Sequence, residues 1–275
     1  MRSAQRETCR MSEALLDIRG LTKRFGGLVA TKQVDLQVRR GEVHALIGPN
    51  GAGKTTLVSQ LGGQLASDSG SITFDGTDIT HWAAHRRARR GLVRSFQITR
   101  LFKSASVLDN VALAVQASRG SSLGAWRPVW RDKALFARAH EVLQSVGLDA
   151  KAHLSVDALS HGERRGLEVG MALAGQPLLV LLDEPMAGMG QEESHSMEQL
   201  IESIRTRCTV LLIEHDVDAV FRLADRVSVL VEGRVIASGT PDAVRRDAAV
   251  IAAYLGDAAP GDACATQTAT RDADA

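Results

Sequence analysis

The stretch VHALIGPNGAGKTT, residues 43–56, decides how this chain folds. It opens with a compact apolar run, Val43–Ile47, which leads straight into glycines and predicts a strand. Gly48–Thr55 then fits the pattern G-x-x-x-x-G-K-[ST]. In this pattern the glycines let backbone N–H groups curl around phosphates, and the start of the following helix adds positive potential. The stretch therefore predicts a strand, a phosphate-binding loop and a helix in succession.

Two side chains of this loop have defined chemistry. Lys54 reaches the β- and γ-phosphates of a nucleotide, and the Thr55 hydroxyl binds Mg²⁺. The alternative is a glycine-rich turn without a ligand, but the full pattern arises by chance in roughly one chain of this length per hundred. We therefore predict nucleotide binding by Gly48, Pro49, Asn50, Gly51, Ala52, Gly53, Lys54, Thr55 and Thr56.

A second apolar run ends in an acidic pair. Leu178–Leu182 is followed by Asp183 and Glu184, so a buried strand would deliver Asp183 to the metal and Glu184 to an attacking water. Such a pair is often only a solvated strand end, but its occurrence together with the Lys54 loop favours a catalytic role.

His215 follows the next apolar strand. Strand ends in such sheets line the nucleotide crevice, so His215 could touch the γ-phosphate. The alternative is a histidine with a structural role only.

The segment Ser160–Glu163, with the sequence SHGE, has two interpretations. One is a capping box, S-x-x-E, that opens a helix over Arg164–Ala174. The other is a γ-phosphate site, since a helix N-terminus with a small serine and a glycine can receive a phosphate. The two are compatible, and both stay open at this point.

Elsewhere, strands and helices alternate. Strands are expected over Val34–Val38, Ser71–Phe74 and Thr209–Ile213, and the run from Val227 to Ser238 predicts a hairpin. Apolar residues at helical spacing predict helices between about 100 and 175, interrupted over Ser118–Pro128. Further helices are expected over Glu192–Ile204 and Val217–Leu223. The pattern predicts an α/β fold with a mainly parallel sheet and a helical insert.

The amino-acid composition excludes several classes of protein for this chain. The chain has 275 residues, 33 basic and 32 acidic, and a net charge of +1 that argues against a nucleic-acid binder. Its longest purely apolar stretch is far shorter than the roughly twenty residues of a membrane span. Cys9, Cys208 and Cys264 form neither a disulfide framework nor a zinc motif. We expect a cytoplasmic protein with disordered ends over residues 1–13 and 257–275.

Five sequence motifs occur in an order that is typical of one protein family. They are GPNGAGKTT, Gln97 in SFQ, LSHGE at Leu159–Glu163, LLVLLDEP, and His215 in IEHD. The chain resembles the ATP-binding subunits of ABC transporters over about residues 15–256. It looks closest to the ATPases of the branched-chain amino acid and amide importers, through RFGGL near Phe25, the segment from Arg94, and the closing VIAAYLG.

The resemblance implies a P-loop NTPase over residues 14–256, with a mixed sheet, a RecA-like core, an antiparallel β lobe and a helical subdomain over about 98–175. It implies hydrolysis of ATP with Mg²⁺. By this resemblance the catalytic residues are Glu184, as general base, His215 and Gln97, and the metal ligands are Thr55, Gln97 and Asp183. Phe25 would stack on the adenine. Ser160 and Gly162 would bind the γ-phosphate of an ATP held by a partner subunit.

The partners implied are two transmembrane permease subunits, docked near Gln97, a second ATPase subunit that is identical or paralogous, and indirectly a solute-binding protein, with no nucleic acid. The chain would then lie at the cytoplasmic face of the inner membrane as a peripheral subunit that powers amino acid uptake. An ATPase of another ABC system, such as lipid export, and a soluble ABC protein without a transport role are the alternatives.

Three features depart from the family pattern or stand outside it. In the signature, His161 replaces a glycine, and Glu163 replaces a glutamine and adds charge near a phosphate unless Arg164 or Arg165 screens it. The loop Met186–Gly190 lacks the aspartate frequent at this point. Finally, a basic cluster is expected to be a solvated helix face; it comprises His85, Arg86, Arg87, Arg89, Arg90, Arg94 and Arg100.

Overall fold

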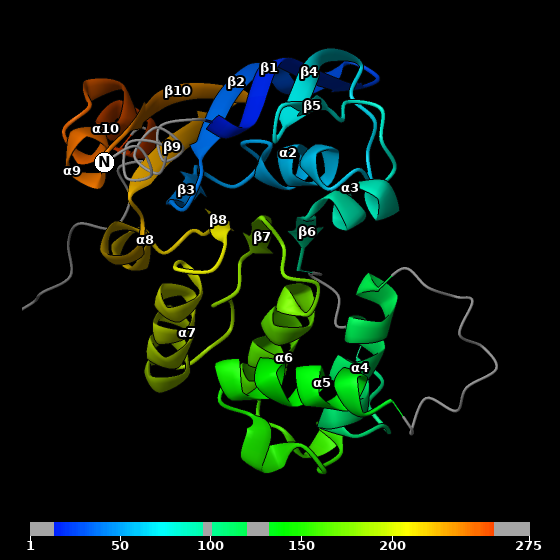
Figure 1. Ribbon diagram of the computed structural model, residues 1–275. Helices are drawn as coiled ribbons and strands as arrows, with labels where there is room; N and C mark the ends of the chain where they lie inside the picture. Colours follow the sequence, from blue (N-terminus) through cyan, green and yellow to red (C-terminus); the bar gives the residue numbers. More distant parts are fainter. Residues whose placement is uncertain (1–13, 96–100, 120–131, 256–275) are drawn as a thin grey trace, which may run out of the picture.

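The computed structural model describes residues 14–95, 101–119 and 132–255, which form two sheets and a helical lobe (Figure 1). A six-stranded sheet runs through the centre in the order β10-β9-β3-β8-β7-β6. A four-stranded sheet, β2-β1-β4-β5, lies above it, with α2 (Lys54–Leu61) between the two. The predictions for residues 1–13, 257–275, Gln97 and Arg100, and for most of 118–128, fall outside the described residues.

Apart from its two edge strands, the central sheet is buried on both faces. Its strands are β3 (Val43–Ile47), β6 (Leu92–Arg94), β7 (Leu179–Asp183), β8 (Thr209–Ile213), β9 (Arg226–Val231) and β10 (Arg234–Gly239). All pair in parallel except β9 with β10. Along β7, Leu179 and Leu181 face the cluster beneath the upper sheet, whereas Val180 and Leu182 face the helices below. This alternation explains the continuous apolar run, and it confirms the predicted mainly parallel sheet.

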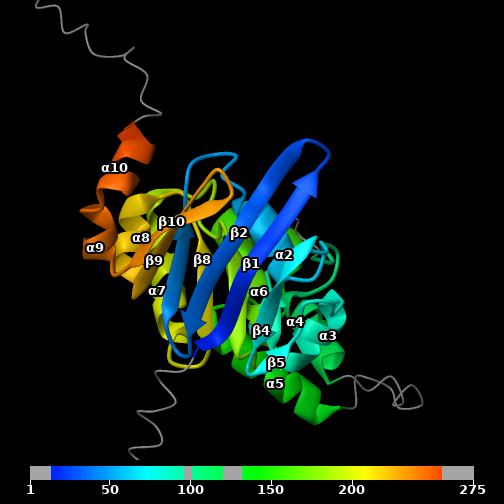
Figure 2. The same ribbon diagram turned by 90° about the horizontal axis from the view of Figure 1, so that it is seen from above.

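The upper sheet is antiparallel and includes a strand that the sequence did not reveal. It contains β1 (Ala14–Phe25), β2 (Leu28–Arg39), β4 (Ser69–Phe74) and β5 (Thr77–Asp78). β1 crosses the top of the molecule (Figure 2). Its pairing with β2 shifts between Ile18 and Leu21, so its buried residues do not alternate, and no period of two was visible in the sequence.

Helices cover the lower face of the sheet and build a separate lobe. α4 (Val107–Ser118), α5 (Lys133–Ser145) and α6 (His161–Leu173) share one apolar cluster with the short helix η3 (Val156–Ala158). Leu148 and Ala152, on either side of the short helix η2 (Asp149–Lys151), belong to the same cluster. α7 (Gln191–Ile204) and α8 (Val217–Leu223) pack beneath β7 and β8. α9 (Pro241–Arg245) and α10 (Ala248–Leu255) follow β10, and α3 (Ala84–Arg90) precedes β6. The predicted helices over 192–204 and 217–223 are therefore present.

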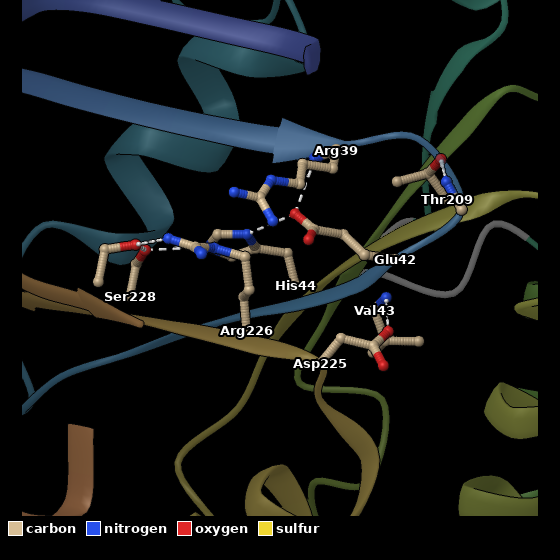
Figure 3. Close-up of polar contacts among 10 residues, drawn as sticks. Arg39, Glu42, Val43, His44, Thr209, Asp225, Arg226 and Ser228 are labelled. Carbon is tan, nitrogen blue, oxygen red and sulfur yellow. Dashed lines mark hydrogen bonds and ion pairs between the residues drawn. The ribbon is translucent and has the colours of Figure 1, made fainter. Parts of the chain in front are cut away.

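A buried polar network joins the strand ends opposite the phosphate loop (Figure 3). His44 is fully buried, with Nδ1 3.0 Å from Glu42 Oε1 and Nε2 2.9 Å from Ser228 Oγ. Glu42 also accepts a hydrogen bond from the Arg39 amide, and Asp225 accepts one from the Val43 amide. These contacts fix the end of β2 against the starts of β3 and β9, so both sheets are held in one orientation around α2.

The basic cluster is not uniformly solvated, which corrects the expectation above. Arg86, Arg89 and Arg90 on α3 are exposed, but Arg87 is only 2% exposed. The Arg87 guanidinium donates to the carbonyls of Gln60 and Leu61 at the end of α2, and to two further carbonyls, those of Thr80 and Trp82. The buried charge of Arg87 is thus satisfied by four backbone carbonyls, two of them at the end of α2.

Candidate nucleotide-binding and catalytic site

A cleft of about 580 Å³ opens where α2 begins. Its walls come from the β1–β2 turn and the first part of β2, the loop between β3 and α2 with the start of α2, the residue after β7, and the β9–β10 turn. Of the predicted residues, the cleft is lined by Phe25, Asn50, Gly51, Ala52, Gly53, Lys54, Thr55, Thr56 and Glu184. Val29, Ala30, Lys32, Glu232 and Gly233 also line it and were not predicted. Phe25 lines the cleft and is 50% exposed, with the Lys23 ammonium 5.7 Å from its ring centroid.

Close backbone contacts fix the conformation of the loop. Gly53 has φ +104°, and a Cβ there would lie 2.2 Å from the Ala30 carbonyl oxygen, so only glycine fits. The Gly233 amide donates to the Ala52 carbonyl at 2.9 Å, and the Lys32 amide donates to the Gly233 carbonyl at 2.7 Å. The loop is thus held between β2 and the β9–β10 turn, while the N–H groups of Gly51 and Gly53 have no hydrogen-bond partner among the described residues.

Lys54 is buried in the first turn of α2, and its ammonium is held by the loop itself. Nζ donates to the carbonyls of Gly48 at 2.6 Å and Pro49 at 3.1 Å. Burial lowers the pKa of Lys54, and the nearby carboxylates of Glu184 and Asp183 act in the opposite direction. The loop therefore presents a cation beside its free N–H groups, the combination that an anionic phosphate requires.

Asp183, at the end of β7, pairs with an arginine that sequence reasoning did not assign to the site. Arg94 Nη2 lies 2.7 Å from Asp183 Oδ2, and the side chains are 11% and 1% exposed. Arg94 Nη1 also donates to Ser59 Oγ on α2. The second carboxylate oxygen, Asp183 Oδ1, is buried and has no partner among the described residues. That oxygen is free to accept from a further ligand, such as the hydration shell of a cation.

Glu184 combines a strained backbone with a position on the cleft wall. Its φ is +48°, in the left-handed region that few residues other than glycine adopt, and strain of this kind clusters at functional sites. The neighbouring Glu214, whose side chain is 1% exposed, accepts hydrogen bonds from the amides of Met186 and His215. Burial raises the pKa of Glu214. Glu214 thus anchors the loop that follows Glu184, a role that its place beside His215 could have suggested.

His215 stands apart from the cleft. The His215 side chain is 60% exposed, and the residue is not among those that line the cleft. Its Nδ1 lies 3.7 Å from Glu214 Oε2, so it remains close to the buried anchor. Asp183, Gly48 and Pro49 likewise lie behind the lining rather than in it. The prediction for Gln97 lies outside the described residues.

The predicted capping box is present at the start of α6. Ser160 Oγ accepts from the Glu163 amide, and the Glu163 carboxylate accepts from the Ser160 amide. Glu163 also pairs with Lys151 on η2, which holds the pKa of Glu163 below its usual range. Of the two arginines that could screen Glu163, Arg164 donates to backbone carbonyls and Arg165 pairs with Glu168. The fold instead brings Lys151 to Glu163 from twelve residues earlier in the sequence.

Ser160 and Gly162 are predicted phosphate ligands, yet neither lines the cleft. Both lie at the N-terminus of α6, where Ser160 is exposed. A carboxylate from α7, that of Glu193, contacts them instead. His161 Nε2 lies 3.4 Å from the Ala187 carbonyl oxygen, so this departure from the family pattern contacts the loop after Glu184. Within one chain the loop of Lys54 and the start of α6 form two separate surfaces.

No helix in the described part of the chain has both the length and the apolar character needed to cross a bilayer. Likewise, among the described residues no cluster of three or more histidine, cysteine or acidic side chains could hold a metal by itself.

Comparison with known proteins gives consistent matches. Residues 31–187 match the model of the ABC transporter family, and residues 234–260 match that of the branched-chain amino acid ATP-binding cassette transporter. The chain is 38% identical over 255 residues to the high-affinity branched-chain amino acid transport ATP-binding protein BraF of Pseudomonas aeruginosa, covering 90% of this chain and 100% of BraF. The Escherichia coli protein LivG, described in the same terms, is 37% identical over the same shares.

The fold also matches solved structures. The ADP conformation of MJ1267, an ATP-binding cassette of an ABC transporter, aligns with a TM-score of 0.80 and 28% identity, over 89% of this chain and 100% of that one.

Proposed function

Because this chain belongs to the ABC transporter family of ATPases, we propose that it powers an importer of branched-chain amino acids or related amino acid and amide solutes. One observation carries the choice of importer: the segment from β10 onward matches the branched-chain amino acid model, outside the part of the chain that the general family model covers. The full-length similarity to BraF and LivG supports the same choice. The chain would act at the cytoplasmic face of the inner membrane.

The cleft residues would hold ATP in a defined orientation. Phe25 would stack on the adenine, and the free amides of the loop together with Lys54 would bind the phosphates. To reach a phosphate, the Lys54 ammonium exchanges its two carbonyl partners for phosphate oxygens. Thr55 and Asp183 fit Mg²⁺, because Thr55 is exposed beside the loop and Asp183 Oδ1 is a buried acceptor with no partner in the described part of the chain. Bound there, the ion would supply charge neutralisation at the phosphates.

Glu184 would act as the general base. It lies on the cleft wall, and its carboxylate would accept a proton from the water whose oxygen attacks the γ-phosphorus, with ADP as the leaving group. The contacts of Glu214 hold the loop after Glu184, so the base keeps its position through the reaction. Gln97 and His215 would complete the surroundings of the γ-phosphate.

The separation of the two surfaces supports a head-to-tail pair of ATPase subunits. Ser160 and Gly162 do not line the cleft of their own chain. In the pair they would bind the γ-phosphate of the ATP held by the partner, whether that partner is identical or a paralogue. Each ATP would then lie between the phosphate loop of one subunit and the start of α6 in the other.

A second groove offers a docking place for the permeases. It has a volume of about 580 Å³ and lies between α3 and β6 on one side and α4 and α6 on the other. Its lining combines apolar side chains such as Ala114 and Met171 with the cations Arg89 and Arg90. We propose that each of the two permease subunits docks a cytoplasmic segment in this groove of one ATPase subunit. A solute-binding protein would deliver the solute to the permeases and so contact the ATPases only indirectly.

The test is to tag the chain in its native cell, solubilise the membranes gently and identify what co-purifies. Two multi-span permeases, with or without a second ATPase, are expected. In the purified complex, Glu184→Gln should reduce ATP hydrolysis by orders of magnitude while ATP binding persists. Recovery of lipid-export components or ribosomal proteins without such permeases would overturn the importer proposal, and wild-type hydrolysis by Glu184→Gln would remove Glu184 as the base.

A further inference from the structure

A carboxylate occupies the donor groups at the start of α6. Glu193 Oε1 lies 3.1 Å from Ser160 Oγ and 3.0 Å from the Gly162 amide nitrogen, and both groups donate to the same oxygen. These two hydrogen bonds hold the pKa of the Glu193 carboxyl below its usual value, so the group is an anion at neutral pH. One anionic oxygen held by a hydroxyl and a helix N-terminal amide resembles a bound phosphate oxygen.

The contact is close along the whole side chain. A Cβ added at Gly162 would lie 2.9 Å from Glu193 Cδ and 3.0 Å from its Cβ and Cγ atoms. A residue other than glycine at position 162 would therefore displace Glu193, whether or not a phosphate is present. Glu193 belongs to the first turn of α7, beneath the central sheet, whereas Ser160 and Gly162 begin α6 of the helical lobe. The contact thus connects the lobe to the core.

We propose that Glu193 is an internal ligand of the γ-phosphate receptor formed by Ser160 and Gly162, which it must vacate before the partner's ATP can bind there. This inference rests on the proposed head-to-tail pair. An oxygen of Glu193 and an oxygen of a γ-phosphate cannot accept from the same two donors, and the two anions repel each other in the same small space. Closing the pair therefore requires Glu193 to leave, and its departure loosens the lobe from the core as ATP is engaged.

Glu192 supplies a matched control. It is the preceding residue of the same helical turn and carries the same charge, but it is exposed, and its carboxylate has no hydrogen bond or ion pair with any described residue. A general effect of charge at the start of α7 would appear in Glu192→Gln as well as in Glu193→Gln. An effect of occupancy at the receptor would appear only in the variants of Glu193.

The experiment uses the complex purified through a tag on this chain, in a Glu184→Gln background that retains ATP. ATP retention is measured as a function of ATP concentration for the parent, Glu193→Gln, Glu193→Ala and Glu192→Gln. For Glu193→Ala we expect the half-saturating ATP concentration to fall about tenfold, which corresponds to about 1.4 kcal/mol. Glu193→Gln should show a smaller fall, and Glu192→Gln none. ADP lacks a γ-phosphate, so its affinity should stay unchanged in all four proteins.

Each outcome decides one claim. An unchanged or increased half-saturating ATP concentration in both Glu193 variants overturns the inference and leaves Glu193 as a structural cap of α6. A parallel change in ADP affinity would also overturn it, because a merely structural effect acts on both nucleotides. If Glu193→Ala fails to fold, Glu193→Gln decides, since it keeps the volume and one acceptor. Failure of the parent complex to retain ATP would instead refute the proposed head-to-tail pair.

Discussion

The Arg94 guanidinium and the Asp183 carboxylate form a buried ion pair between neighbouring strands, with 2.7 Å between Nη2 and Oδ2. Asp183 is the last residue of β7, and Arg94 is the last residue of β6, just before the segment that carries Gln97. Arg94 also contacts Ser59 on α2. The pair therefore ties three elements together at the place where the phosphate loop, the acidic pair and the helical lobe meet.

Loss of Arg94 should be costly unless Asp183 is neutralised at the same time. We expect Arg94→Met to lower the free energy of unfolding by about 3 kcal/mol, because it leaves a buried carboxylate without its counter-ion. The double variant with Asp183→Asn should recover much of that loss. Urea denaturation of the wild type, the two single variants and the double variant gives the coupling energy, and a value near zero would show that the ion pair does not stabilise the fold.

Two glycines of the phosphate loop should respond differently to alanine. Gly53→Ala places a methyl group 2.2 Å from the Ala30 carbonyl, and we expect it to destabilise the protein by more than about 3 kcal/mol. At Gly51, with φ +79°, a Cβ would meet nothing within 4 Å, so Gly51→Ala should cost only about 1 kcal/mol of backbone strain. Thermal unfolding without nucleotide distinguishes the two, and equal losses would contradict the close contact at Ala30.

The buried arginine of α3 should matter far more than its exposed neighbour. Arg87→Met removes donors to four carbonyl groups, and we expect a loss of about 3 kcal/mol in unfolding free energy. Burial also lowers the pKa of Arg87 to about 10. Arg86 lies 4.9 Å from the Trp82 ring centroid and is exposed, so Arg86→Met should cost less than about 1 kcal/mol. Similar losses at both positions would restore the solvated-face interpretation.

The buried carboxyl of Glu214 should make the free energy of unfolding depend on pH. Because burial raises its pKa in the folded state above the usual 4.5, the carboxyl favours folding when protonated, and that contribution is lost as the pH rises through the folded-state pKa. The stability of the wild type relative to Glu214→Gln should therefore decrease as the pH is raised from about 4.5 toward neutrality. Urea unfolding at a series of pH values measures the difference. A difference that grows with pH would show that the hydrogen bonds to the ionised form outweigh burial.

The sequence by itself determined the phosphate loop with its flanking strand and helix, and the strand that ends in the acidic pair. Val43–Ile47, the glycine loop and Lys54 are contiguous, and so are the apolar strand and the pair Asp183–Glu184. Such segments encode their own strand, turn and helix through residues that interact locally, so the pattern predicts both the structure and the chemistry. The capping box at Ser160 was predictable for the same reason, since its two hydrogen bonds join residues three positions apart.

Only the tertiary structure decided which distant groups face one another. Arg94 and Asp183 are 89 residues apart in sequence, Glu193 and Gly162 31, and Lys151 and Glu163 12, and each pair meets because separate elements pack together. β1 was missed because its shifted register removes the alternation on which strand prediction depends. Charge pairing and burial depend on the packed arrangement of the whole chain, and a local pattern contains no information about either.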